Sequence, residues 1–311
     1  MSEEIQFPFP EDYDPRAHYA SGSEQFRNPW PSFDPRELHR TALFKAKLGA
    51  PTAVPVPDKW QVVSVIKPDF AQNDSNRCKT KVTWLGHASF LLEFPHCTKS
   101  ERGFRVLLDP FFSDRAGPLT FIGPKRFTPA PCRIQDLPEL DCVCLSHNHY
   151  DHTDRLSLIS LWKDQQERFP TLHLRLFVGL RFETWCLSNI PGLQENNVLG
   201  LDWFQGKRLL RQGFEGFEKL DVYCTPAQHE SHRSVTDKNF FLWCSWTFVH
   251  TLAVTSGGQA LITKIHFAGK PFFFSRARLD KGFVWSCRRY RLPKRSSGSC
   301  ITSRCAKSLS R

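Results

Sequence analysis

Residues 141–154 read Asp-Cys-Val-Cys-Leu-Ser-His-Asn-His-Tyr-Asp-His-Thr-Asp, and this stretch decides the predicted fold. Its first six residues are mostly apolar, as in a buried strand, and alternation along such a strand would place Cys142 and Cys144 on one face. A His-x-His-x-Asp-His pattern follows directly, and a polar turn that is merely rich in histidine is the alternative reading. We therefore interpret the stretch as a strand that ends in a metal-binding loop.

The ligand types in this loop favour zinc, which is commonly bound by imidazole and carboxylate groups. His147 and His149, two residues apart on an extended loop, can face one ion. Asp151 and His152 project towards a neighbouring position, where a second ion about 3.5–4 Å away would hold a shared hydroxide.

Two histidines leave the first ion short of ligands, so a further histidine is expected from a distant strand end. His229 follows a predicted strand at residues 220–225 and is our candidate for that ligand. His232, three residues later, is a weak candidate for orienting a substrate phosphate, and we favour an exposed loop histidine there.

Short β-rich runs lie on both sides of the loop, and strands outnumber helices. A helix capped by Thr153 is predicted to residue 168 with Leu156, Ile159 and Trp162 on its apolar face, and a second helix is predicted at 180–190. No Gly-x-Gly-x-x-Gly follows a strand, so a layered α/β body is favoured over a Rossmann unit. The predicted strands are 81–85, 89–94, 104–109, 141–146, 172–178, 220–225, 240–249 and 261–267.

Composition excludes several classes of protein. With 311 residues, 40% hydrophobic and 23% charged, the chain is neither collagen, nor a coiled coil, nor wholly disordered. No apolar run reaches the roughly 18 residues of a membrane span, and the acidic start resembles neither a secretory nor a transit peptide. We expect an intracellular protein, cytoplasmic or peripheral on a membrane. Its 11 cysteines form no Cys-x-x-Cys pair and are interpreted as reduced core thiols.

The chain divides into three parts that differ in residue composition and charge. Residues 1–75 are rich in Pro and aromatics and are predicted to form an extended arm, with a short helix at 35–48, and 76–269 form the main domain. Residues 270–311 hold 12 of the 42 basic residues and one of the 31 acidic ones, so the first 269 residues carry 30 of each. The body therefore lacks a positive surface for nucleic acid, and the basic tail is predicted to be disordered or read out of frame.

Five further motifs accompany the metal loop, and together they carry a family resemblance. The chain resembles the metallo-β-lactamase superfamily, and more closely its branch of N-acylphosphatidylethanolamine-hydrolysing phospholipase D, over roughly residues 26–269. The motifs are Phe-Arg-Asn-Pro-Trp at 26–30, Leu-Gly-His-Ala-Ser at 85–89, Leu-Asp-Pro-Phe-Phe-Ser-Asp-Arg at 108–115, Thr-Pro-Ala-Gln-His at 225–229, and Leu-Trp at 242–243.

The resemblance implies a four-layer αβ/βα sandwich with the ligand loops along one edge. It implies one zinc held by His147, His149 and His229, and a second site that starts with Asp151 and His152. Asp109 is the implied carboxylate that supports a histidine of the metal loop, with an ordinary strand-ending aspartate as the alternative. The Gly-His-Ala segment at 86–88 is read as a tight turn rather than as a source of a ligand.

The implied reaction is hydrolysis of N-acylphosphatidylethanolamine to phosphatidate and an N-acylethanolamine at a membrane surface, by water activated on zinc. The alternatives are another hydrolase of this superfamily, acting on a lactone or a sugar phosphate, and a metal-poor remnant that binds lipid or a protein partner.

One departure from the family pattern follows Gly269. The family carries a metal-bridging Asp in a Gly-Asp-Thr-Gly segment there, whereas this chain has Lys270 and no later histidine. The resemblance therefore implies a sandwich that is incomplete in its C-terminal half. We favour a changed reading frame, a misplaced splice junction or a disrupted gene as the cause, and an evolved basic tail is the alternative. We expect at most one tightly bound zinc, where the intact family has two, and impaired catalysis.

Overall fold

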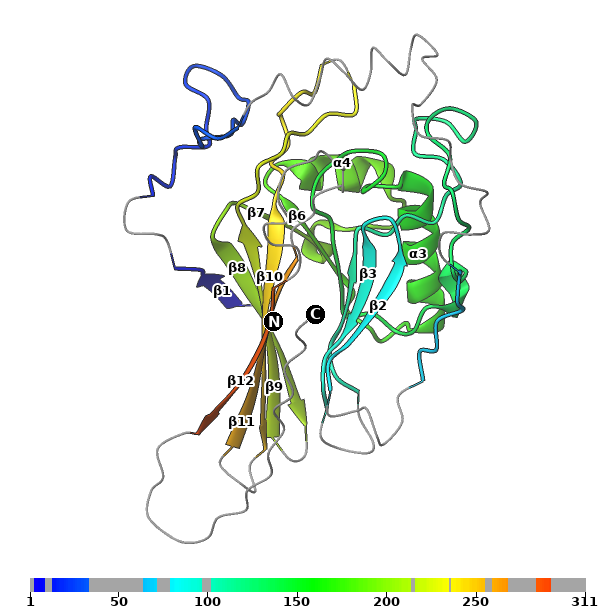
Figure 1. Ribbon diagram of the computed structural model, residues 1–311, viewed down its shortest axis with the longest axis vertical. Coiled ribbons are helices and arrows are strands. Elements are labelled where there is room, and N and C mark those ends of the chain that lie inside the picture. Colours follow the sequence, from blue (N-terminus) through cyan, green and yellow to red (C-terminus); the bar gives the residue numbers. More distant parts are fainter. Residues whose placement is uncertain are drawn as a thin grey trace, which may run out of the picture.

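Two six-stranded sheets packed face to face make up the body of the protein (Figure 1). The computed structural model describes residues 3–8, 13–33, 64–71, 79–96, 102–213, 216–234, 236–254, 259–267 and 284–291. No helix among these residues has both the length and the apolar content needed to cross a membrane.

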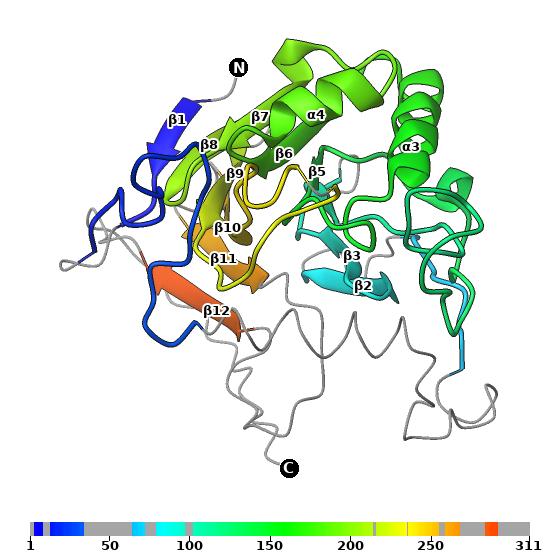
Figure 2. The ribbon, with the colours of Figure 1, turned by 90° about the horizontal axis from the view of Figure 1, so that it is seen from above.

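The first sheet has the strand order β2-β3-β4-β5-β6-β7. Strands β2 to β4 pair antiparallel, and β4 to β7 pair parallel. Helices α3 and α4 lie over its outer face, where they bury a second hydrophobic core (Figure 2). The elements are β2 Lys81–Gly86, β3 Ser89–Glu93, β4 Arg105–Leu108, η1 Ile134–Asp136, β5 Cys142–Cys144, α3 Arg155–Arg168, β6 Arg175–Gly179, α4 Phe182–Asn189, η2 Glu195–Asn197 and β7 Val198–Leu201.

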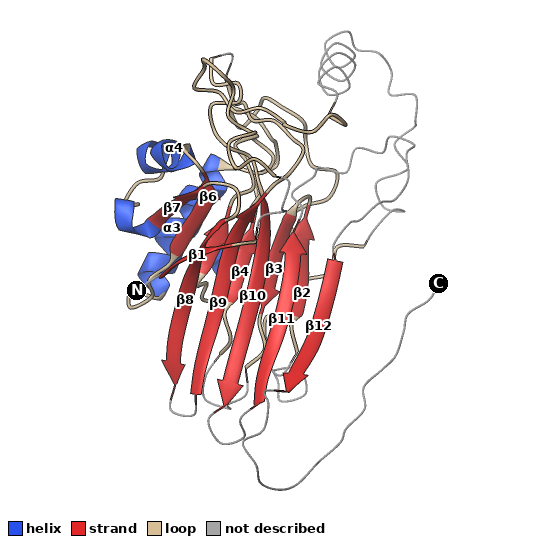
Figure 3. Ribbon diagram, turned by 90° about the vertical axis from the view of Figure 1, so that its left-hand side faces the viewer, coloured by secondary structure: helices blue, strands red, loops and turns tan. Residues whose placement is uncertain are grey.

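The second sheet is antiparallel throughout, in the order β1-β8-β9-β10-β11-β12 (Figure 3). Its inner face packs on the first sheet through large apolar side chains such as Trp246 and Phe248, both fully buried. The strands are β1 Glu3–Gln6, β8 Gln205–Gly213, β9 Gly216–Thr225, β10 Ser245–Val254, β11 Gln259–Phe267 and β12 Val284–Arg291.

Strand β5 is buried on both faces, and its alternation directs side chains to two different cores. Cys142 and Cys144 both enter the core between the sheets, as the alternation predicted, whereas Val143 packs under the helices. Strand β4 alternates in the same way: Val106 and Leu108 enter the core between the sheets, whereas Leu107 packs under the helices. The α/β sandwich class is thus confirmed, and among the described residues its helices cover the first sheet only.

The start of α3 differs by one residue from the prediction. Asp154 caps the helix, because its carboxylate accepts from the backbone N–H of Ser157, and the Thr153 hydroxyl instead donates to the carbonyl of His147 at 2.7 Å. The predicted apolar face was also partly wrong, since Leu156 is 49% exposed whereas Leu158 is buried. The backbone N–H of Phe112 donates to the Ser157 hydroxyl, which turns this side of the helix towards the body.

The N-terminal segment contributes to both the sheet and the core. Strand β1 pairs antiparallel with β8 at one edge of the second sheet. The Phe26 side chain is 1% exposed and belongs to the core between the sheets. The helix predicted at 35–48 lies outside the described residues.

Strand β12 pairs antiparallel with β11 from Val284 to Arg291. The expectation of an unpacked 270–311 is therefore wrong for the backbone of these eight residues, because the edge of β11 offers N–H and C=O groups that another strand can satisfy. Residues 268–283 and 292–311, which include Gly269, Lys270 and Asp280, lie outside the described residues.

Two leucines of α3 test the orientation of this helix. Leu158→Ala should lower the free energy of unfolding by about 2–5 kcal/mol, because it removes a buried side chain and leaves a cavity. Leu156→Ala should change it by less than about 0.5 kcal/mol, because that side chain lies at the surface. Urea denaturation followed by tryptophan fluorescence measures both, and equal losses would contradict the observed face.

Candidate metal centre

The predicted ligands converge where strands of the two sheets end. Asp109 follows β4 and the metal loop follows β5, so both leave the carboxyl edge of the parallel part of the first sheet. His229 follows β9 of the second sheet. The centre therefore lies between the ends of the two sheets.

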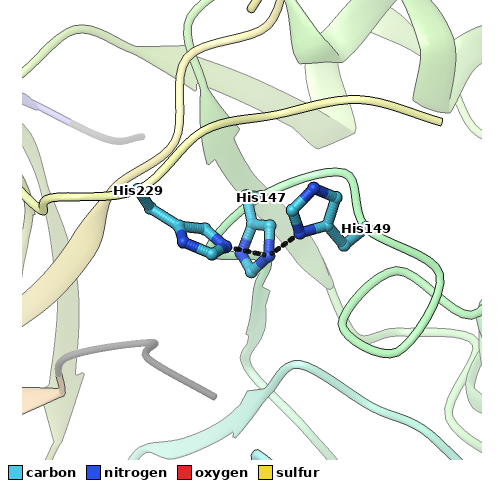
Figure 4. Close-up of side chains that lie close together, drawn as sticks. All are labelled: His147, His149 and His229. Atoms are coloured by element: carbon cyan, nitrogen blue, oxygen red, sulfur yellow. Dashed lines mark hydrogen bonds between the residues drawn. The ribbon is translucent and has the colours of Figure 1, made fainter. Parts of the chain in front are cut away.

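His147, His149 and His229 form a first cluster, whose ligand nitrogens all lie within 4.8 Å of one another (Figure 4). The Nε2 atom of His147 lies 2.9 Å from Nδ1 of His149 and 2.9 Å from Nε2 of His229. A ring nitrogen carries one lone pair or one proton, so a single Nε2 atom is poorly suited to two such neighbours. A cation among the three nitrogens satisfies all of them, and the residues fit a metal ion on this ground.

Burial keeps the imidazoles of His147 and His149 neutral. It lowers the pKa of His147 well below its usual value, and neighbouring histidines, His152 first, lower it further. Burial also lowers the pKa of His149 to about 3, with a further contribution from His232. Neutral rings present their lone pairs, which is the state that binds metals.

His87, Asp151 and His152 form a second cluster beside the first, with ligand atoms again within 4.8 Å. Nε2 of His87 lies 2.9 Å from Oδ2 of Asp151, and that oxygen lies 3.7 Å from Nε2 of His152. Burial would raise the pKa of Asp151, but the hydrogen bond from His87 and the nearby histidines outweigh it and lower the pKa. An ionised carboxylate and two imidazoles are a donor set that suits a divalent cation.

His87 is not among the ligands that the sequence predicts. The tight turn predicted at 86–88 is present between β2 and β3, with φ values of +96° at Gly86 and +48° at His87. This turn brings the ring against the metal loop. No local spacing connects residue 87 with residues 151 and 152, so only the tertiary fold reveals the contact.

Asp109 is fully buried and accepts three hydrogen bonds at this edge of the sheet. Its carboxylate accepts from the Ser146 backbone N–H at 2.7 Å and from the Ser146 hydroxyl at 2.6 Å, and its Oδ2 lies 2.8 Å from Nδ1 of His152. Burial would lower the pKa of His152, but the hydrogen bond and charge of Asp109 outweigh it and raise the pKa. Asp109 thus lies where it can orient His152.

Two residues that the sequence analysis missed hold the ligand segments in place. The Asn28 side chain donates to the carbonyl of His229 at 2.6 Å and accepts from its backbone N–H at 3.1 Å. The Arg233 guanidinium donates to the carbonyl of Asn148, between the two histidines of the loop, and to that of Thr153, just after His152. Asn28 lies in the Asn-Pro-Trp motif, which was the available signal.

His232 lies at the rim of the first cluster. It is half-buried, and its Nδ1 is 3.1 Å from Nε2 of His149. The structure therefore brings it to the site, beside a candidate ligand, and not onto a remote exposed loop.

Comparisons with known proteins agree with this arrangement. A family model described as a beta-lactamase superfamily domain matches residues 104–263, just over half of the 311 residues. An uncharacterized protein of Mycobacterium tuberculosis is 35% identical over 187 residues, 60% of this chain and 43% of the relative. N-acyl-phosphatidylethanolamine-hydrolyzing phospholipase D 1 of Caenorhabditis elegans is 33% identical over 170 residues, 54% of this chain and 42% of the relative.

A third relative is the Saccharomyces cerevisiae protein named mitochondrial N-acyl-phosphatidylethanolamine-hydrolyzing phospholipase D. It is 31% identical over 199 residues, 64% of this chain and 38% of the relative. The chain thus spans about two fifths of the length of the curated relatives it matches. The matched domain, the two-sheet fold and the shared similarity lead to one conclusion: the chain belongs to the metallo-β-lactamase superfamily.

Proposed function

We propose that this protein is a zinc-dependent phosphodiester hydrolase that acts on N-acylphosphatidylethanolamine, with strongly reduced turnover. One observation carries the proposal: two groups of three ligand residues converge on the same loop, at the ends of strands from both sheets. Adjacent metal positions are the arrangement that phosphoester hydrolysis uses to hold the attacking and leaving oxygens.

The donor set supports zinc as the metal. The first cluster offers three imidazole nitrogens and the second two imidazoles with a carboxylate, whereas magnesium and calcium prefer oxygen ligands. None of the free cysteines among the described residues belongs to either cluster. We assign His147, His149 and His229 to the first ion, and Asp151 and His152 to the neighbouring position.

When bound, zinc supplies a Lewis acid and a water molecule whose pKa is near 7. The chain's own residues hold and orient that centre. The Asp109 carboxylate accepts a hydrogen bond from Nδ1 of His152, so that Nε2 of His152 faces the site. We assign to His232, at the rim, the role of donating a hydrogen bond to a phosphate oxygen of the substrate, since its Nδ1 lies 3.1 Å from Nε2 of His149.

A lipid substrate is supported by the names of two relatives and by an apolar loop after β4. Phe121 and Phe127 are 72% and 78% exposed, and Leu119 and Ile122 are exposed beside them. Arg126 ties this loop to the centre, since its guanidinium donates to the carbonyls of Phe111 and Leu85, close to the turn that carries His87. Apolar side chains beside a metal centre suit a substrate presented at a membrane surface.

Reduced turnover follows from the missing shared ligand. Among the described residues, no carboxylate belongs to both clusters, and Lys270 stands where the family resemblance calls for a bridging aspartate. A lysine at that place in the sequence offers no carboxylate that two ions could share. Loss of a single preorganised electrostatic group costs catalysis about 10²–10³-fold, and loss of a well-held second metal should cost more.

The metal content of the protein is the first test. Purified and dialysed protein should retain one equivalent of zinc, and His147→Ala should lose most of it, because the first cluster then has two ligands. His173→Ala, which removes an exposed histidine outside both clusters, is the control. Elemental analysis gives the stoichiometry, with circular dichroism as a check of folding. Zinc-free wild-type protein would favour the metal-poor lipid-binding or partner-binding alternative.

Asn28 tests how the N-terminal segment supports the first cluster. Asn28→Ala should weaken zinc binding about 10–100-fold, since it removes both hydrogen bonds to the backbone of His229 and outer partners of ligands have effects of this size. Gln228→Ala is the matched control, because it removes only an exposed contact of the adjacent residue with Ser32. Competition with a chelating zinc indicator measures both affinities, and equal affinities would contradict the role of Asn28.

Activity is tested with zinc-loaded protein and N-acylphosphatidylethanolamine in mixed micelles. N-acylethanolamine should be released at least about 10³-fold more slowly than by an intact relative such as the Caenorhabditis elegans enzyme. The residual rate should disappear in His147→Ala. Turnover within tenfold of the intact enzyme would contradict the proposed loss of activity. Turnover that is unchanged in His147→Ala would show that catalysis does not depend on the first cluster.

A further inference from the structure

We propose that His87 is a metal ligand and that, with Asp151 and His152, it forms a second and weaker zinc site in this chain. The inference rests on the proposed metal centre, and it concerns a residue for which neither the sequence motif nor the family resemblance supplies a ligand role. It changes the expected capacity of the centre from one ion to two.

Donors from two separate segments converge at the second cluster. His87 comes from the β2–β3 turn, and Asp151 and His152 come from the metal loop, 64 residues further along the chain. Their ligand atoms nevertheless lie within 4.8 Å of one another, with Nε2 of His87 at 2.9 Å from Oδ2 of Asp151. Three donors of types that zinc accepts meet the count of protein ligands found in catalytic zinc sites.

One buried nitrogen of this cluster has no hydrogen-bond partner among the described residues. The His152 side chain is 0% exposed, and its Nε2 has no such partner among the described residues. Its Nδ1 is already held by Asp109 at 2.8 Å. Buried polar atoms are seldom left unsatisfied, and a metal-binding histidine engages a carboxylate with one nitrogen and the ion with the other.

The backbone of His87 has an uncommon conformation. Its φ of +48° lies in the left-handed region, which only a few per cent of non-glycine residues occupy, with Asn, Asp and His the most frequent among them. The Trp84 indole donates to the His87 carbonyl at 2.9 Å, and the ring lies edge-on to His152 with centroids 5.3 Å apart. Such strained residues persist where surrounding contacts fix them, and they cluster at functional sites.

The same geometry explains why the second site should be weaker than the first. The side chains of His87 and Asp151 are 36% and 33% exposed, so the cluster opens to solvent on one side. Water can fill the remaining coordination position there, as in catalytic zinc sites, whereas the first cluster is deeper in the protein. The second ion should therefore exchange on dialysis, in agreement with one tightly retained equivalent.

The competing interpretation is a metal-free contact in which His87 and Asp151 are joined only by their hydrogen bond. Metal titration separates the two. The full-length chain is stripped with a chelator and titrated with zinc by calorimetry, and with cobalt(II) by visible absorption, which reports the coordination of each ion. We expect two binding events, a tight one followed by a weaker one.

The decisive variant is His87→Asn, because asparagine tolerates positive φ and the turn should be preserved. We expect at least about 100-fold weaker binding of the second ion, since loss of a direct ligand should cost no less than loss of an outer partner. The first ion should bind as in wild type. Asp151→Asn should give the same pattern, and His173→Ala, which removes an exposed histidine outside both clusters, should bind both ions normally.

Two results would overturn the inference: a single binding event in the wild-type chain, or a second event of unchanged affinity in His87→Asn. These outcomes do not depend on turnover. If both ions bind as expected and N-acylphosphatidylethanolamine is not cleaved, the proposed substrate is wrong and the second zinc site is supported. If cleavage occurs and only one ion binds, the substrate is supported and the second zinc site is wrong.

Discussion

The buried carboxylate of Asp109 is the group on which the candidate metal centre depends. A carboxylate taken out of water must be fully hydrogen-bonded, and Asp109 meets this need with the backbone and hydroxyl of Ser146 and with the ring of His152. These contacts join the end of β4 to both ends of the metal loop. The rigid parallel strands therefore fix the positions of the ligands, and the loop has little freedom to rearrange.

The parts of the centre that are local in sequence could be predicted from it. A strand with period two, closed by closely spaced histidines, implies a buried edge and a ligand loop, and both are present at 141–154. His229 was reached by the same reasoning, because ligands gather at strand ends. The structure brings it to 2.9 Å from His147.

What the sequence did not show depends on contacts between distant segments. Asn28 and His229 are 201 residues apart, and His87 and Asp151 are 64 apart, so no periodicity relates them. The buried face of α3 was misjudged for a similar reason. Leu156 fits an apolar helical stripe, but the cap at Asp154 and the contact of Ser157 with Phe112 set the rotation of the helix. Strand β12 needed the partner edge of β11, which the basic composition of the tail does not indicate.

The central claim is that histidine nitrogens at the strand ends, and not the 11 cysteines of the chain, hold the metal. Zinc X-ray absorption spectroscopy of protein carrying one equivalent tests this most directly. The account predicts a shell of nitrogen and oxygen ligands at about 2.0–2.1 Å with multiple scattering from imidazole rings. A shell of sulfur ligands at about 2.3 Å would contradict it.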